Sequence, residues 1–150
     1  MIKLSTKGHY GARLMLDLAL HYGEGPVLLK DIANRQEISV KYLWNLVESL
    51  RVAGLVESYR GRHGGYSLAK KPSEITMKDI IYVFEGRSCL VDCVCNPKYC
   101  ERSEACVTRD LWGDISNQIS DILEAVTLED MMKRHEEKQK CLSVENISGV

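Results

Sequence analysis

The chain has 150 residues, of which 45% are hydrophobic and 27% charged, and its formal net charge is −1. This composition predicts a globular fold with a real core and excludes a disordered chain. No run approaches the roughly 18 consecutive apolar residues of a membrane span. Asp17 interrupts the apolar part of the N-terminus and no small-residue cleavage site follows, so we expect a cytoplasmic protein that does not interact with membranes.

Helical periodicity predicts three helices in the first third of the chain. Ser5 is placed to cap the first helix, which stops before Gly23, and Ser39 is placed to cap the third. Gly54 follows the third helix, where a left-handed residue is favoured. The apolar positions of the three helices are Ala12, Met15, Leu16 and Ala19, then Leu29, Ile32 and Ala33, and finally Leu43, Val47 and Leu50. The second and third helices form a helix-turn-helix, whose second member would enter the major groove of DNA.

A β-hairpin is predicted directly after the third helix. Residues 55–59 and 66–68 have the pattern of two short strands, and residues 60–65 that of a glycine-rich tip. A hairpin in this position is a wing, and arginine at its tip suits phosphate or a narrow minor groove. The fold class is therefore mostly α with a small β-hairpin, a winged helix-turn-helix over residues 1–72.

Charge supports DNA binding by this first part. Residues 1–72 carry eleven Lys and Arg against six Asp and Glu, a balance of +5, whereas residues 73–150 carry nine against fifteen, a balance of −6. A basic module joined to an acidic one is typical of a polyanion-binding domain with an appendage. Trp44 is either a DNA contact or a residue buried in the core, and burial is the commoner situation for tryptophan. The candidate DNA contacts are Ser39, Lys41, Tyr42, Trp44, Asn45, Arg60, Arg62 and His63.

Residues 73–140 are predicted to form a second unit with a long helix. Thr76 is placed to cap a short helix through Phe84, and Thr127 one from Leu128 to about Lys140, followed by a loosely ordered tail over residues 141–150. Between them runs a long amphipathic helix whose apolar stripe this chain is too small to cover. We therefore expect a symmetric homodimer, which also suits a palindromic DNA site. The stripe consists of Leu111, Ile115, Ile119, Ile122 and Val126.

Five of the six cysteines lie between positions 89 and 106, in a segment without helical or strand periodicity. Clustered cysteines in a chain without an export signal favour metal or redox chemistry over a disulfide framework. The spacing leaves an iron–sulfur cluster, a zinc site and a thiol redox sensor open, because no histidine lies nearby and only the region from Cys89 to Cys100 supplies paired cysteines.

The sequence resembles the Rrf type-two family of winged-helix regulators, most closely its iron–sulfur-sensing IscR branch. The resemblance rests on LSTKGHYGARLMLDLAL, EISVKYLWNLVESLRVAGLVES, RGRHGGYSLAK and CVTRDLW, which extend to about residue 135. It implies a transcriptional repressor of cluster-assembly genes. It also implies a cluster, which we expect to be [2Fe-2S] rather than [4Fe-4S], held by Cys95, Cys100 and Cys106 with His9, Cys93 or Cys89 as the fourth ligand.

The sequence departs from the family pattern at both sites. The first cysteine gap is four residues instead of five, and Arg109 stands where IscR proteins have a ligating histidine; arginine stays protonated and cannot bind a metal. Trp44-Asn45 replaces a frequent Glu-Gln pair, and Arg62-His63 a frequent Pro-Gly pair, so the DNA sequence recognised is expected to differ.

Other functions remain as alternatives. The resemblance also allows a cluster-free regulator switched by cysteine oxidation or by a partner, as in the CymR branch, or a nitric-oxide sensor, as in the NsrR branch. An electron-transfer protein or enzyme is the third class. No catalytic constellation supports an enzyme, because the four histidines are scattered along the chain.

Overall fold

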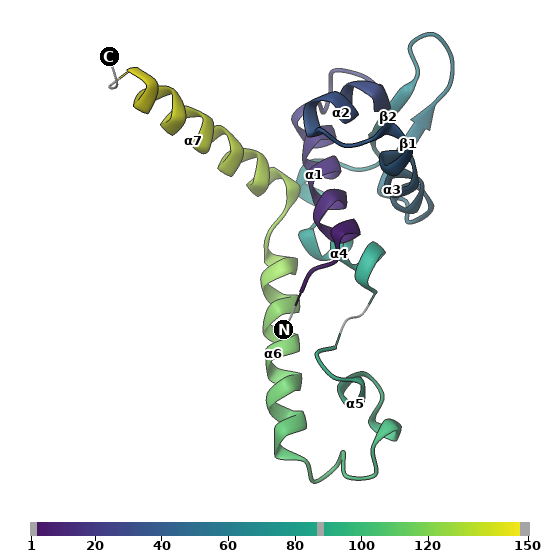
Figure 1. The fold of residues 1–150 in the computed structure, drawn as a ribbon, viewed down its shortest axis with the longest axis vertical. Helices are drawn as coiled ribbons and strands as arrows, with labels where there is room; N and C mark the ends of the chain where they lie inside the picture. Colours follow the sequence, from purple (N-terminus) through teal and green to yellow (C-terminus); the bar gives the residue numbers. More distant parts are fainter. Residues whose placement is uncertain (1–2, 87–88, 148–150) are drawn as a thin grey trace.

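The computed structural model describes residues 3–86 and 89–147, with side chains described up to Ser143. It shows a helical body that carries a hairpin, and a long helix that leads away from that body (Figure 1). The elements are α1 (Thr6–Leu20), α2 (Leu29–Gln36), α3 (Val40–Val52), β1 (Val56–Tyr59), β2 (Gly65–Leu68), η1 (Pro72–Glu74), α4 (Met77–Glu85), α5 (Asp92–Cys95), η2 (Pro97–Tyr99), α6 (Val107–Ala125) and α7 (Leu128–Ile147). The predicted fold class, mostly helical with one hairpin, is confirmed.

Capping residues start the helices where the sequence predicts. The Ser5 hydroxyl accepts a hydrogen bond from the backbone N–H of Gly8 at 3.0 Å, and the Ser39 hydroxyl accepts one from that of Tyr42 at 3.2 Å. Thr76 forms a reciprocal capping box with Asp79. The fully buried core of this body includes Leu14, Met15, Ile32, Leu43, Val47, Leu50, Ile75, Ile80 and Leu128. Burial of these side chains holds α1 and α3 against α4 and the start of α7.

A buried carboxylate fixes the helix-turn-helix. Asp17 is only 3% exposed and accepts hydrogen bonds from Arg35 at 2.7 and 3.1 Å and from the Gln36 amide at 2.9 Å. Arg13 binds the same glutamine through its side-chain oxygen at 3.0 Å and its carbonyl at 2.8 Å. These contacts tie the end of α2 to α1, just before the turn at Glu37, whose φ of 54° is left-handed. Asp17 thus connects α1 to the end of α2 from within the core.

The hairpin is anchored to the loop before α2. Its antiparallel strands pair Val56 with Leu68 and Tyr59 with Gly65, and Val27 exchanges two backbone hydrogen bonds with Tyr66, both 2.8 Å. A Cβ at Gly65 would lie 2.5 Å from the Val27 carbonyl oxygen, so only glycine allows this approach. The wing therefore leaves the body at a fixed position beside α3 (Figure 1).

The second part of the chain differs from the prediction in two places. The segment between α4 and α6, predicted to be irregular, contains one α-helical turn (α5) and one 3-10 turn (η2). The last helix, predicted to end near Lys140, continues to Ile147, so residues 141–147 are helical and residues 148–150 lie outside the described part. The longer last helix has a clear reason, because α7 meets no glycine or proline before Gly149.

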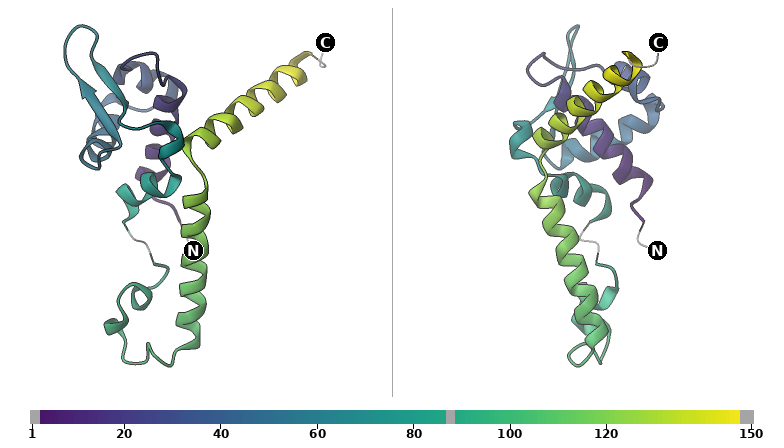
Figure 2. Two further views of the ribbon diagram at one scale, coloured as in Figure 1. Left: turned by 180° about the vertical axis from the view of Figure 1, so that it is seen from behind. Right: turned by 90° about the vertical axis from the view of Figure 1, so that its left-hand side faces the viewer.

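The two long helices leave the body in different directions. α6 runs away from α4 with the cysteine segment beside it, and α7 projects from the junction (Figure 2). The junction is closed by backbone hydrogen bonds from Met77 to Val126 at 2.8 Å and from Leu128 to Ile75 at 2.9 Å. None of the described helices is both long and apolar enough to cross a membrane.

Candidate nucleic-acid interface and cysteine segment

The N-terminal half of α3 presents polar side chains to solvent. Ser39, Lys41 and Asn45 are exposed, and so is Trp44, at 53% of its surface. Trp44 is therefore not buried in the core, although burial is the commoner situation for tryptophan. Tyr42 is half-buried, and its ring packs edge-on against Tyr10 with 5.9 Å between ring centroids. Four of the five predicted contacts on α3 are thus free to meet a groove, and the fifth shares its surface with the core.

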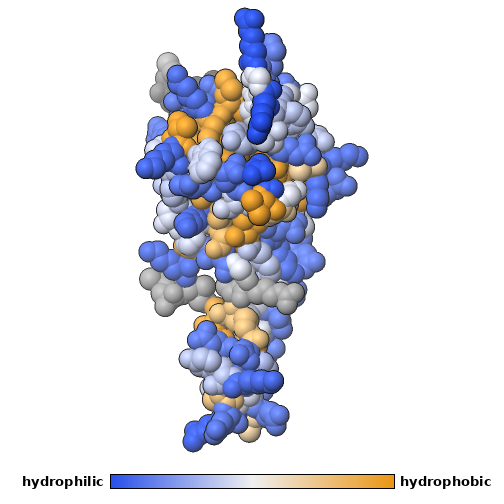
Figure 3. All heavy atoms as spheres, turned by 90° about the vertical axis from the view of Figure 1, so that its right-hand side faces the viewer, coloured by the Kyte–Doolittle hydropathy of each residue, from blue (hydrophilic) through white to orange (hydrophobic). Residues whose placement is uncertain are grey.

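The hairpin tip presents positive charge. Arg60, Arg62 and His63 are all exposed, and within the described residues neither arginine forms an ion pair. Gly61 has a φ of 103°, and a Cβ at Gly64 would lie 2.4 Å from the Tyr59 carbonyl oxygen, so glycine is required for the tight tip. Hydrophilic side chains project from the end of the molecule where the hairpin lies (Figure 3). The arginine charges are therefore available to a polyanion.

Two cysteines of the segment are joined to each other. Cys89 and Cys95 form a disulfide, with their Cα atoms 5.7 Å apart. Cys95 is the last residue of the α5 turn, which is closed by the hydrogen bond from the Asn96 N–H to the Asp92 carbonyl at 2.9 Å. Cys93, Cys100 and Cys106 are half-buried free thiols, and Cys141 is an exposed one on α7.

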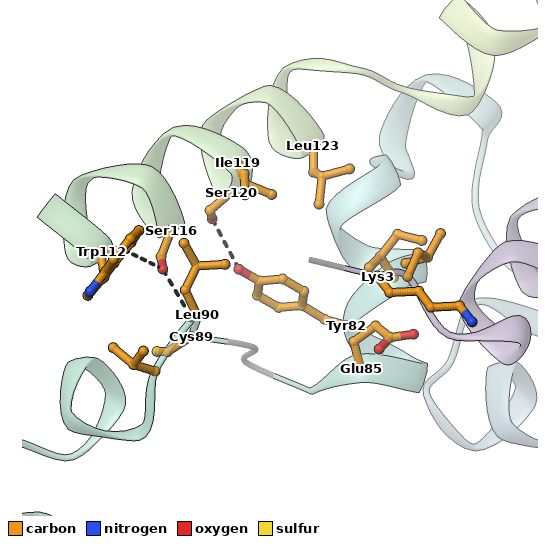
Figure 4. Close-up of a pocket in the computed structure, with 13 residues that line it drawn as sticks. Lys3, Tyr82, Glu85, Cys89, Leu90, Trp112, Ser116, Ile119, Ser120 and Leu123 are labelled. Atoms are coloured by element: carbon orange, nitrogen blue, oxygen red, sulfur yellow. Dashed lines mark hydrogen bonds between the residues drawn. The ribbon is translucent and has the colours of Figure 1, made fainter. Parts of the chain in front are cut away.

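Side chains of α6 hold this segment in place. The Arg109 guanidinium donates through Nε to the Cys93 carbonyl at 2.9 Å and through Nη1 to the Ser103 carbonyl at 3.4 Å. The Ser116 hydroxyl accepts from the Leu90 N–H at 3.3 Å and donates to the Trp112 carbonyl at 2.7 Å (Figure 4). Arg109 therefore does not fill the place of a ligand; it fastens the cysteine segment through backbone carbonyls.

The thiol of Cys106 lies at the start of α6, where it is the N-cap residue. A hydrogen bond with the Thr108 hydroxyl, 3.2 Å away, and a weaker one from the Arg109 N–H lower the pKa of this thiol from its ordinary value. Both hydrogen bonds favour the thiolate, which is the form that binds metals and reacts with oxidants.

The cysteine thiols have the right chemistry for binding an iron–sulfur cluster, but the structure does not arrange them around one. Thiolates are the usual ligands of such clusters. However, no set of three or more His, Cys, Asp or Glu side chains is arranged to hold a metal ion in the described part of the chain. Two of the candidate ligands, Cys95 and Cys89, have their sulfur atoms in the disulfide. The structure thus does not bring the three predicted ligands together.

The remaining candidate ligand, His9, lies on α1 and is exposed. Within one chain α1 belongs to the body, whereas the cysteine segment lies beside the far end of α6 (Figure 1). Within the described residues, His9 and the cysteines therefore do not form a common set of metal ligands.

An apolar groove of about 630 Å³ lies between α4, α6 and the start of the cysteine segment. It is lined by Tyr82, Cys89, Trp112, Ile119 and Leu123 among others, with a hydrogen bond of 3.1 Å between the hydroxyls of Tyr82 and Ser120 (Figure 4). Beside the groove, α6 has no buried residue along its nineteen positions. The described residues therefore leave Leu111, Ile119 and Ile122 of α6 largely exposed.

Comparison with known proteins identifies the family. The Rrf2 family profile, described as "Iron-dependent Transcriptional regulator", matches residues 4–134. The chain belongs to the Rrf2 family. Protein rrf2 of Nitratidesulfovibrio vulgaris is 43% identical over 132 residues, which cover 88% of both chains.

Two solved Rrf2 structures share the fold. That of IscR from T. potens is 46% identical, with a TM-score of 0.76, and covers 92% of this chain and 91% of its own. That of CymR, described as the global cysteine regulator of B. subtilis, is 42% identical, with a TM-score of 0.76, and covers 89% and 98%. The chain is thus similar to transcriptional regulators of two branches, and these relatives are not named as enzymes.

Some residues of the Rrf2 site were not found by sequence reasoning. The sequence identifies Arg109 only as a residue that cannot bind a metal and gives Ser116 no role, yet both hold the cysteine segment. Asp17 was recognised only as an interruption of an apolar run. Such contacts cannot be predicted from a local sequence pattern, because each joins residues of different elements.

Proposed function

We propose that this Rrf2 protein is a cytoplasmic transcriptional repressor that binds double-stranded DNA as a homodimer and senses iron–sulfur cluster supply. The DNA part rests on one observation above all: the exposed polar start of α3 lies in the same domain as two wing arginines without ion pairs. In winged-helix proteins such a helix enters the major groove and reads base edges. Asn45 and Lys41 supply donors there, and the wing arginines meet phosphate or the minor groove.

The dimer part rests on α6. Its apolar face includes Leu111, Ile115, Ile119 and Ile122. The described residues cover this face only in part, and Leu111 and Ile122 are 52% and 65% exposed. A second α6 packed against this face by a two-fold axis would remove it from water. The same axis would set two α3 helices on a palindromic operator.

The sensing part rests on the cysteine segment. It holds five cysteines, and α6 fixes it through Arg109 and Ser116. We propose Cys95, Cys100 and Cys106 as cluster ligands, with Cys93 or the partner chain's copy of His9 as the fourth. A [2Fe-2S] cluster is preferred, and cluster-assembly genes are the proposed targets.

A second candidate function is favoured by the disulfide between Cys89 and Cys95. It is a cluster-free regulator switched by cysteine oxidation, and the similarity to CymR supports it as much as that to IscR supports the first. A nitric-oxide sensor would also use the cluster and differs from the first candidate only in its signal.

Anaerobic purification tests these functions. Visible absorption with iron and acid-labile sulfide counts is expected to show a coloured protein with matched iron and sulfide. Duplex binding measured at several salt concentrations is expected to be strongly salt-dependent. A colourless protein that resists reconstitution but binds duplex DNA would leave the oxidation-switched regulator. A coloured protein without duplex binding would exclude both regulators.

Replacing Arg60 or Arg62 by alanine is expected to weaken duplex binding across all sequences, because these charges are proposed to neutralise phosphates. The plot of log affinity against log salt should become shallower by about one unit for each phosphate that is no longer neutralised. Fluorescence anisotropy with a labelled duplex measures this. Lys138→Ala, which removes another exposed positive charge, this one from α7, is the control and should leave the slope unchanged. An unchanged slope in the wing variants would remove the wing from the interface.

A further inference from the structure

We infer that Cys89 and Cys95 form a reversible redox site whose disulfide excludes Cys95 from cluster binding, so that oxidation locks the protein in its apo form. This inference rests on the proposed cluster function and adds a regulatory step to it. It starts from the disagreement between the expected ligand set and the structure. Five cysteines share the segment, yet the pair that is joined contains one proposed ligand, Cys95, and the cysteine nearest to α4, Cys89.

Backbone hydrogen bonds hold both sides of this pair in addition to the sulfur–sulfur bond. The α5 turn is closed by hydrogen bonds from Val94 to Val91 at 3.1 Å and from Asn96 to Asp92 at 2.9 Å. On the side of Cys89, the Leu90 N–H is held by Ser116. The Cα separation of 5.7 Å lies in the range that a disulfide needs without backbone movement. A reduced chain with the same turn therefore keeps the two thiols adjacent.

The middle of the turn is held as well. The Cys93 carbonyl accepts the hydrogen bond of Arg109, and Cys93 remains a free thiol although it is closer in sequence to Cys95 than Cys89 is. The geometry therefore selects Cys89 as the partner. Because a cluster ligand must be a thiolate, a sulfur in the disulfide is lost to the ligand set until it is reduced.

The oxidant is a hydroperoxide. One thiol of the pair attacks a peroxide oxygen, the O–O bond breaks, and a sulfenic acid and an alcohol or water form. The second thiol then displaces water from the sulfenic sulfur and the S–S bond forms. Overall two thiols lose two electrons and two protons, and the peroxide is reduced by two electrons. A dithiol reverses the step by thiol–disulfide exchange.

The test compares the wild type with Cys89→Ser and, as a control outside the cysteine segment, Cys141→Ser. Each apo protein is treated with hydrogen peroxide, freed of it, and mixed anaerobically with a protein-bound [2Fe-2S] donor in thiol-free buffer. Iron and sulfide are counted per chain. Mass spectrometry of the alkylated tryptic peptide 88–98 reports which pair is joined. The same proteins treated with dithiothreitol before mixing are the reduced controls.

Oxidised wild type is expected to take up at least about tenfold less cluster than reduced wild type. Removing a residue that only supports a metal ligand already lowers metal affinity by about tenfold or more, and losing the ligand itself should lower it at least as much. Its peptide should contain the Cys89–Cys95 bond and an alkylated Cys93. Cys89→Ser should load equally well after either treatment. Cys141→Ser, which removes an exposed thiol of α7 outside the cysteine segment, should behave as the wild type does.

Three outcomes would overturn the inference, and they are distinguishable. Equal loading of oxidised and reduced wild type, with the bond present, means that Cys93 or another thiol serves in place of Cys95. A bond between another pair means that the geometry does not choose the partner. Failure of reduced wild type and of Cys89→Ser to load any cluster refutes the cluster function itself, and this inference with it.

Discussion

Replacing Ile122 by aspartate is expected to convert the dimer to a monomer and to lower affinity for a palindromic duplex by on the order of 100-fold or more, the avidity that two linked half-site contacts provide. Ile122 is 65% exposed on a helix without buried residues, so the substitution should change the free energy of unfolding of the monomer little. In a dimer the same carboxylate would be desolvated among apolar side chains, at a large cost in free energy. The apolar face of α6 would then no longer hold two chains together.

The mass in solution, by light scattering or sedimentation, measures the first effect. Anisotropy with a duplex selected from a random pool by the wild type measures the second. Asn117→Asp is the matched control, because it adds the same charge to an exposed position on another side of α6. An Ile122→Asp protein that keeps the mass of a dimer would show that the chains associate through another surface.

Replacing Cys100 by alanine is expected to remove the cluster almost completely and to leave the fold intact. Cys100 lies between η2 and α6, outside the buried core, and its carbonyl would still accept the Ser103 N–H at 3.1 Å. Substitution at such a position changes the free energy of unfolding by about 0.5 kcal/mol or less. Losing one of three proposed thiolates removes a ligand that no neighbouring histidine can replace, since Arg109 stands near the segment instead.

Iron and acid-labile sulfide per chain, with the visible spectrum, measure the loss, and thermal unfolding followed by circular dichroism measures the fold. Cys141→Ala is the control, because that exposed thiol belongs to α7 and not to the cysteine segment. A Cys100→Ala protein that retains its colour would remove Cys100 from the ligand set. One that fails to fold would indicate a structural metal site instead of a sensor.

The cysteine segment carries both of the proposed chemistries, cluster binding and thiol oxidation. The disulfide between Cys89 and Cys95 and the free thiols of Cys93, Cys100 and Cys106 lie in one short stretch held by α6. The proposed competition for Cys95 joins both chemistries in one switch, and the α6 helix that holds the switch also carries the proposed dimer face.

Most of the fold was predictable because its signals are local. Ser5, Ser39 and Thr76 cap helices through atoms three residues away, and Gly54 adopts its left-handed φ of 76° at the end of α3. The glycines of the wing allow a tight tip for the same kind of reason. Helix, turn, helix and hairpin therefore follow from the sequence, and with them the exposed candidates on α3 and the wing.

Only the tertiary structure decided the contacts between elements. Which of five clustered cysteines pair cannot be deduced from their spacing, because the answer depends on how the α5 turn is held against α6. The roles of Asp17 beneath the turn and of Arg109 behind the cysteine segment likewise depend on distances between elements. The sequence by itself determined the local elements and the chemistry they carry. The three-dimensional packing determined which of those groups meet, because proximity in space is set by the whole core and not by neighbours in the chain.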